Sequence, residues 1–337
     1  MITGGGKRIH IQEISARDGF QIEPRFIATD DKVAFINGLS RAGLAKIEVT
    51  SFSSPRAIPT LADAELVLRK IDRVPGVEYA ALVPNVRGCA RALEVQLDEI
   101  NVVVSASETH NRANLRMSRE QSLAGIREIA ALVQGRVHLS VSISTAFGCP
   151  FEGPMDSARV LELVDRLSQI GVGRMSLCDT TGVANPAQVY ALCLKAHTDW
   201  PQVVFTAHFH DTRAMGLANA VAALEAGIDH FDASLGGLGG CPFAPGASGN
   251  VCTEDLVHMF EAMGYTTGVD LEQLLKLARG LPALVGHEVP GQVLKAGPAT
   301  RRYPVPGPDG SALDASCQST PREDRQAGLS NTSERRS

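Results

Sequence analysis

The most constraining feature of this 337-residue chain is a regular alternation of short apolar runs with longer segments of helical periodicity. The short runs predicted to be strands are Ile9–Ile14, Lys46–Thr50, Glu78–Val83, Glu99–Ser105, Val137–Ser144, Arg174–Cys178, Val203–His210 and His230–Leu235. The segments predicted to be helices are Asp30–Ser40, Leu61–Ile71, Ser118–Val133, Ser157–Ile170, Pro186–Ala196 and Thr212–Ala226. Strands that alternate with helices in this way predict βαβ units and a parallel sheet.

Eight such units, one every ~29 residues, favour a (β/α)₈ TIM barrel with its active site at the C-terminal face. The competing architecture is a doubly wound open sheet, but no G-x-G-x-x-G turn follows the first strand. We assign residues 1–303 to the barrel domain, with Leu271–Leu284 as one further helix after the barrel. From Pro304 onward Pro, Gly, Ser, Asp and Arg dominate, and this composition predicts a disordered tail over residues 304–337.

Composition excludes several classes of protein. The formal net charge of −5 argues against a dedicated nucleic-acid binder, which usually carries a basic patch. No apolar run reaches the ~18 residues of a membrane span, and Met1–His10 lacks the apolar stretch of a secretory signal. The seven cysteines are scattered and form no C-x-x-C pair, which favours reduced thiols over disulfides or structural zinc. We therefore expect a cytoplasmic protein without nucleic-acid or membrane partners.

Charged side chains interrupt the predicted strands near their C-terminal ends. The first strand is followed by Arg17 and Asp18, the second carries Glu48, and the sixth is followed by Asp179. The seventh ends at His208–Asp211. Each group alone is weak evidence, because loops commonly carry solvated charge. Together they predict acid, imidazole and guanidinium groups around one rim of the barrel.

His208 and His210 are two residues apart on a predicted strand, so both side chains point to the same face. Two neutral imidazoles on one face suit a divalent metal, and Asp18 is the natural carboxylate to complete the site. Mixed nitrogen and oxygen ligands without a thiolate favour Mg²⁺ or Mn²⁺, with zinc as an alternative. The competing interpretation is one core histidine beside one surface histidine.

The glycine-rich stretch Gly236–Asn250 follows the last predicted strand and carries Cys241 beside Pro242. Long glycine-rich loops at barrel mouths are often lids, and a thiol at the centre of one would move over a pocket. The alternative is a flexible surface turn with an incidental cysteine.

A series of motifs recurs in order along residues 8–285. They are Ser15–Glu23 (SARDGFQIE), Glu48–Pro55 (EVTSFSSP), Ala146–Gly153 (AFGCPFEG), Asp179–Val183 (DTTGV), His208–Thr212 (HFHDT) and Gly237–Asp255. Together they resemble the 3-hydroxy-3-methylglutaryl-CoA (HMG-CoA) lyase family. Claisen-type synthases and carboxyltransferase barrels share the Arg-Asp opening and the H-x-H pair, but they lack the glycine-rich loop with its central Cys-Pro.

The resemblance implies a role for each matching residue. The implied metal ligands are Asp18, His208, His210 and Asn250. The implied catalytic residues are Arg17, which would contact the thioester carbonyl and stabilise the enolate, Asp18, and Cys241 as the thiol of the lid. The residues implied in binding the substrate or supporting the site are Arg17, Glu48, Asp179 and Glu254. The implied partners are an acyl-CoA substrate and further copies of the chain, in a homodimer or higher homo-oligomer.

The sequence also departs from the family pattern. Ser142 stands where animal lyases carry a tyrosine, and Thr145 stands where they carry a cysteine. The stretch 107–114 matches only in part, and the tail does not match. These changes leave the metal and loop motifs intact, so they bear on the acyl substrate more than on the type of reaction.

The resemblance therefore predicts a metal-dependent carbon–carbon lyase that cleaves HMG-CoA to acetyl-CoA and acetoacetate, as in leucine degradation. One alternative is a lyase for citramalyl-CoA or for a longer 3-hydroxy-3-alkylglutaryl-CoA. A condensing synthase and a catalytically silent barrel are further alternatives. The thiol of Cys241 argues against the synthase, and the complete set of site residues argues against the silent barrel.

Overall fold

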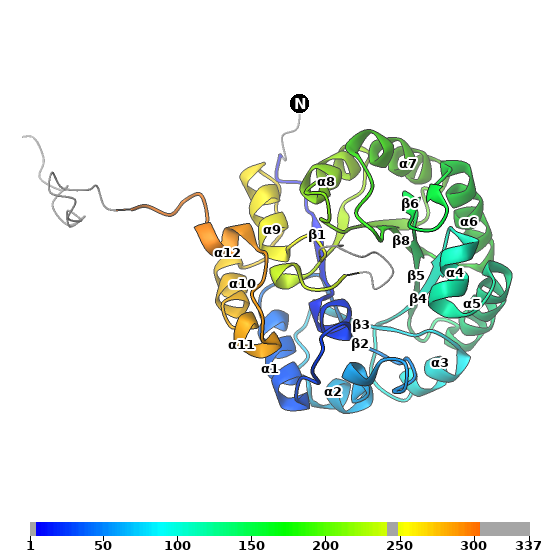
Figure 1. Ribbon diagram of the computed structural model, residues 1–337, viewed down its shortest axis with the longest axis horizontal. Coiled ribbons are helices and arrows are strands. Elements are labelled where there is room, and N and C mark those ends of the chain that lie inside the picture. Colours follow the sequence, from blue (N-terminus) through cyan, green and yellow to red (C-terminus); the bar gives the residue numbers. More distant parts are fainter. Residues whose placement is uncertain (1–4, 241–248, 304–337) are drawn as a thin grey trace, which may run out of the picture. The chain divides into compact units, whose positions relative to one another are not determined.

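A computed structural model describes residues 5–240 and 249–303. Eight parallel strands close into a barrel in the order β1-β10-β9-β8-β5-β4-β3-β2, and a ring of helices surrounds them (Figure 1). The barrel strands are β1 (His10–Glu13), β2 (Lys46–Ser51), β3 (Glu78–Leu82), β4 (Glu99–Ser105), β5 (His138–Ser144), β8 (Arg174–Asp179), β9 (Val204–Phe209) and β10 (His230–Ala233). The predicted TIM barrel is confirmed, and all eight predicted strands are present.

Helices follow most strands and cover the outside of the barrel (Figure 1). They are α1 (Thr29–Ser40), α2 (Ala64–Lys70), α3 (Val86–Ala92), α4 (Glu108–Leu115), α5 (Arg119–Val133), α6 (Ser157–Ile170), α7 (Pro186–Asp199), α8 (Gly216–Glu225), α9 (Thr253–Ala262), α10 (Leu271–Ala278), α11 (Leu281–Val285) and α12 (Gln292–Ala296). A short hairpin of β6 (Gly148–Cys149) and β7 (Gly153–Pro154) lies outside the barrel sheet. Short helical turns cover Ser15–Gly19, Pro59–Leu61 and Leu235–Gly237.

The prediction of one continuous helix over Leu271–Leu284 is wrong. The segment contains two helices, α10 and α11, and the break lies at Arg279 and Gly280. Pro282 stands in the first turn of α11. Proline lacks a backbone N–H and its ring clashes with the carbonyl four residues earlier, so a helix cannot run through this position unbroken. The apolar periodicity continues across the break because both helices bury leucines.

The interior of the barrel is unusually polar, and this positions the site. Along β5, Val141 and Ile143 are fully buried in the apolar layer between strands and helices. The alternate residues Ser140, Ser142 and Ser144 border cavities inside the barrel. Barrels of this type are usually filled by layers of bulky branched side chains. Here small hydroxyl side chains leave room for charged groups in the interior.

The chain divides into two units, Met1–Ala296 and Gly297–Ser337. The first contains the whole barrel and its helices. The predicted tail, residues 304–337, lies outside the described residues. In the part of the chain that the structure describes, no helix combines the length and apolarity needed to cross a bilayer. The described cysteines are all free thiols and all buried: Cys89, Cys149, Cys178, Cys193 and Cys252.

Candidate active site

A cavity of about 770 Å³ opens at the C-terminal end of the barrel strands. Four predicted site residues line it: Arg17, Asp18, His208 and His210. They come from the turn after β1 and from the end of β9, which are far apart in sequence but meet at one rim. The structure thus brings together the groups that the sequence placed at strand ends.

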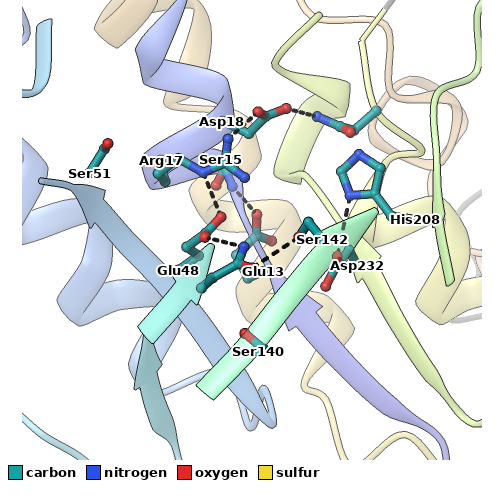
Figure 2. A network of polar contacts seen from close by, with 12 residues as sticks. Glu13, Ser15, Arg17, Asp18, Glu48, Ser51, Ser140, Ser142, His208 and Asp232 are labelled. Carbon is teal, nitrogen blue, oxygen red and sulfur yellow. Dashed lines mark hydrogen bonds and ion pairs between the residues drawn. The ribbon is translucent and has the colours of Figure 1, made fainter. Parts of the chain in front are cut away.

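Arg17 is held between two carboxylates. It lies in a π-helical turn, Ser15–Gly19, that begins two residues after β1. Its Nε donates to Glu48 Oε2 at 2.5 Å, and its Nη1 donates to Asp18 Oδ1 at 2.5 Å (Figure 2). Burial alone would lower the pKa of Arg17, but the charges of Glu48 and Asp18 outweigh it and raise that pKa. The guanidinium is therefore a permanent, fixed cation at the cavity wall.

A chain of hydrogen bonds holds Glu48 in turn. Asn101 on β4 donates from Nδ2 to Glu48 Oε1 at 2.9 Å, and Ser142 Oγ donates to Asn101 Oδ1 at 3.0 Å. Figure 2 shows this chain leading from Ser142 on β5 to Arg17. The sequence analysis did not assign Asn101 to the site. The sequence feature that marks Asn101 is a polar residue at an inward-facing position of a strand, with an apolar residue on each side.

The side chains of Asp18 and Asn250 lie next to each other at the barrel mouth. Asn250 Nδ2 donates to Asp18 Oδ2 at 2.8 Å and to the carbonyl of Leu238 at 3.0 Å. Burial would raise the pKa of Asp18, but the positive charge of Arg17 and the nearby imidazoles lower it. Gly239 leaves space beside this pair, because a Cβ there would lie 2.5 Å from Asn250 Nδ2 and 2.8 Å from Asp18 Oδ2. The site thus requires glycine at this position.

His208 and His210 both face the cavity, as the i, i+2 spacing predicts, and their ring centroids are 5.3 Å apart. His210 forms a backbone bridge with Asn250, which ties the end of β9 to the chain after the glycine-rich loop. Asp232 on β10 contacts His208 Nδ1 through Oδ2 at 3.3 Å. Burial would lower the pKa of His208, but the hydrogen bond and charge of Asp232 raise it.

These residues provide oxygen atoms and imidazole nitrogen atoms that can bind a divalent cation. Asn250 Oδ1 is buried, and no donor among the described residues lies within hydrogen-bond distance of it. An unpaired buried acceptor is costly, and a cation would satisfy it. No three His, Cys, Asp or Glu side chains of the described residues are already gathered closely enough to hold an ion. Arg17 donates to one oxygen of Asp18, and Asn250 donates to the other.

Asp179 and Glu254 are not among the described residues that line the cavity. Asp179 accepts hydrogen bonds from the backbone of Val183 and Ala184, which fixes the turn after β8. Glu254 is fully buried in the first turn of α9 and accepts from the backbone of Gly236 at 3.0 Å. Cys241 lies outside the described residues. The roles predicted for these three residues stay predictions.

Glu13 is a second buried carboxylate that the sequence analysis did not assign. Its oxygens accept from the backbone of Ser15 at 2.8 Å, from the backbone of Leu235 at 3.0 Å and from Thr253 Oγ1 at 2.7 Å. It therefore joins the turn that carries Arg17 to the segment that follows β10. Burial raises the pKa of Glu13 against the effect of these hydrogen bonds.

Comparison with known proteins places this site in a family. A family model described as HMGL-like matches residues 8–280, which contain the barrel and every described residue of the site. The chain belongs to the HMGL-like family. A hydroxymethylglutaryl-CoA lyase of Bacillus subtilis is 47% identical over 290 residues, which are 86% of this chain and 97% of the relative. An (R)-citramalyl-CoA lyase of Chloroflexus aurantiacus is 40% identical over 301 residues, which are 86% of this chain and 95% of the relative.

A solved structure supports the assignment of this protein to the HMGL-like family. An HMG-CoA lyase from Acinetobacter baumannii, solved in complex with coenzyme A and 3-methylmalate, has a TM-score of 0.86 and 48% sequence identity. The alignment covers 90% of this chain and 100% of that chain. The likeness thus extends over the barrel and the helices after it.

Proposed function

We propose that this protein is a divalent-metal-dependent HMG-CoA lyase, which cleaves its substrate to acetyl-CoA and acetoacetate. The observation that carries the proposal is the grouping at one barrel rim of a fixed guanidinium, Arg17, with Asp18, His208, His210 and Asn250. The high identity to lyases over nearly their whole length supports it.

In this proposal Asp18, His208, His210 and Asn250 hold the cation, and Mg²⁺ or Mn²⁺ suits their mixed oxygen and nitrogen atoms. A bound divalent ion lowers the pKa of a coordinated hydroxyl and orients it. Supporting the fit are the unpaired Oδ1 of Asn250 and the space that Gly239 leaves beside Asp18.

Arg17 stabilises the departing enolate. Cleavage of the bond next to the thioester places negative charge on the thioester oxygen, and a fixed cation stabilises that charge as it develops. The contacts to Glu48 and Asp18 hold the guanidinium in place before the substrate binds, so little reorganisation is needed during the reaction. We further propose that Cys241 donates the proton that converts the enolate to acetyl-CoA, and that Glu48, Asp179 and Glu254 support the site.

A second candidate function is a citramalyl-CoA lyase. The 40% identical relative that carries this name supports it. The cavity wall offers a further reason, because Ser142 and Ser144 are small hydroxyl side chains that a different acyl group can contact. Both functions use the same bond cleavage and the same site.

A substrate panel tests the proposal and separates the two candidates. The purified protein is incubated with HMG-CoA, citramalyl-CoA and 3-hydroxy-3-alkylglutaryl-CoA thioesters, with Mg²⁺ or Mn²⁺ and after chelation, and products are identified by mass. We expect the highest kcat/KM with HMG-CoA and no turnover after chelation. Higher kcat/KM with citramalyl-CoA would favour the second candidate, and no cleavage of any thioester would reject both.

We also propose that the protein acts in the cytoplasm as a homo-oligomer, in the degradation of leucine, and without nucleic-acid or membrane partners. The scattered free cysteines support a reducing compartment. Analytical ultracentrifugation at several concentrations measures the oligomeric state.

A further inference from the structure

The pairing of β9 with β10 places a carboxylate beside one of the proposed metal ligands. In this parallel pair the register partner of His208 is Asp232. Side chains of partner residues on neighbouring strands point to the same face of the sheet, which here is the barrel interior. Both side chains are about nine-tenths buried, at 10% relative exposure each. The fold thus fixes the two groups side by side.

The contact is made by one particular nitrogen of the imidazole. Asp232 Oδ2 lies 3.3 Å from His208 Nδ1, and Figure 2 shows Asp232 below the ring of His208. A carboxylate can only accept a hydrogen bond, so the contact places the proton of a neutral imidazole on Nδ1. The lone pair of the ring is then on Nε2. Neutral imidazole in this tautomer is ready to bind a cation through Nε2.

Asp232 has no evident role in holding the fold together. Within residues 5–240 and 249–303, the side chain of Asp232 forms one hydrogen bond, which is the contact with His208. Other buried carboxylates of the barrel, such as Glu13, accept several hydrogen bonds that join separate segments. A buried carboxylate with a single hydrogen-bond partner costs free energy, which the nearby charge of Arg17 offsets only in part, so a fold alone is better served by an apolar residue there.

We propose that Asp232 is a positioning residue that fixes His208 in its Nδ1-protonated tautomer and orients the ring so that Nε2 binds the divalent cation. The inference rests on the proposed function for the identity of the cation site. Carboxylates that accept a hydrogen bond from a metal-binding histidine act in this way in many metal sites, and their loss typically lowers metal affinity 10- to 100-fold.

The chain contains a matched control for the substitution. Asp229 contacts His230 Nδ1 through Oδ1 at 2.8 Å, which is the same type of pair. His230 borders a separate cavity at the opposite, N-terminal end of the barrel. The substitution Asp229→Ala therefore removes a carboxylate–histidine contact without touching the proposed cation site.

The experiment combines metal binding with tautomer analysis on the full chain. Binding of Mn²⁺ alone is measured by electron paramagnetic resonance for wild type, Asp232→Ala, Asp232→Asn and Asp229→Ala. We expect a 10- to 100-fold weaker Kd for Asp232→Ala. Asp232→Asn should retain most of the affinity, because its amide oxygen still accepts from Nδ1–H. Asp229→Ala should match wild type.

The tautomer of His208 is read in the metal-free protein from long-range ¹H–¹⁵N spectra, with Asp232→Asn available if the alanine variant does not fold. We expect the Nδ1–H form in wild type and in Asp232→Asn, and a mixture or the Nε2–H form in Asp232→Ala. Unchanged Mn²⁺ affinity in Asp232→Ala, or an Nε2–H tautomer in wild type, would overturn the inference. Binding of Mn²⁺ with this pattern but without lyase activity would instead reject the proposed function.

Discussion

Glu254 offers a stability prediction whose size follows from the structure. Burial raises the pKa of its carboxyl from 4.5 to about 7, against the hydrogen bond from the backbone of Gly236, and the charges of Asp255 and Glu13 add to the rise. Oε1 of Glu254 has no hydrogen-bond partner among the described residues. The folded protein therefore holds a proton on Glu254 that the unfolded chain releases at lower pH.

The sign of the effect follows from proton linkage. Where the folded state binds more protons than the unfolded state, the free energy of unfolding falls as pH rises. The contribution of Glu254 is fully present below pH 4.5 and is lost as pH rises through about 7. Because one pKa unit corresponds to about 1.4 kcal/mol, the free energy of unfolding falls by roughly 2.5 kcal/mol between pH 5 and pH 8.

Glu254→Gln removes this pH dependence, because glutamine resembles the protonated carboxyl and cannot ionise. The assay is urea unfolding followed by circular dichroism at pH 5, 6, 7 and 8, for wild type, Glu254→Gln and the exposed control Glu128→Gln on α5. Between pH 5 and pH 8, the free energy of unfolding of Glu254→Gln should rise by roughly 2.5 kcal/mol relative to that of wild type. The free energy of unfolding of Glu128→Gln should not change relative to that of wild type. Parallel pH profiles for wild type and Glu254→Gln would show that Glu254 does not cause the pH dependence.

Three further predictions concern the cavity. Arg17→Met should raise the activation free energy by on the order of 3 kcal/mol, which lowers kcat, and should change KM little. The reason is that the guanidinium acts on charge that develops in the transition state. A change confined to KM in steady-state assays would contradict this. Gly239→Ala should weaken Mn²⁺ binding by roughly 10- to 100-fold, because the new Cβ meets Asn250 and Asp18. Calorimetry against Gly173→Ala, where a Cβ meets nothing, measures the effect, and equal affinities would argue against it. Cys241→Ser should keep substrate and metal binding but lose most turnover, since a hydroxyl is a poor acid at neutral pH; normal turnover would assign the proton to another donor.

The barrel was predictable from sequence because each strand carries its signal locally. The eight apolar runs have the right length and spacing, and one strand, Glu99–Ser105, agrees with the structure at both ends. The break between α10 and α11 was visible as Gly280 and Pro282, but the continuous apolar periodicity favoured one helix. Local sequence patterns thus predict the helices and strands, and competing patterns within one segment shift the predicted ends.

The candidate site was predictable only where residues follow strand ends or match a motif. Arg17, Asp18 and the two histidines match motifs and lie at or just after the C-terminal ends of strands, and the structure gathers them around one cavity. Asn101 and Asp232 lie within strands, and their partners Glu48 and His208 are on other strands. Such contacts depend on barrel register, which sequence spacing alone does not give.

Carbon–carbon bond cleavage of HMG-CoA through an enolate of acetyl-CoA can be followed directly by running the reaction in D₂O. HMG-CoA is incubated with the protein and Mg²⁺ or Mn²⁺, and both products are quantified by mass spectrometry. We predict equal amounts of acetoacetate and acetyl-CoA, with one deuterium in the methyl group of acetyl-CoA, because the enolate takes its proton from an exchangeable donor. Intact HMG-CoA after prolonged incubation, or acetyl-CoA formed without deuterium, would contradict cleavage through this enolate.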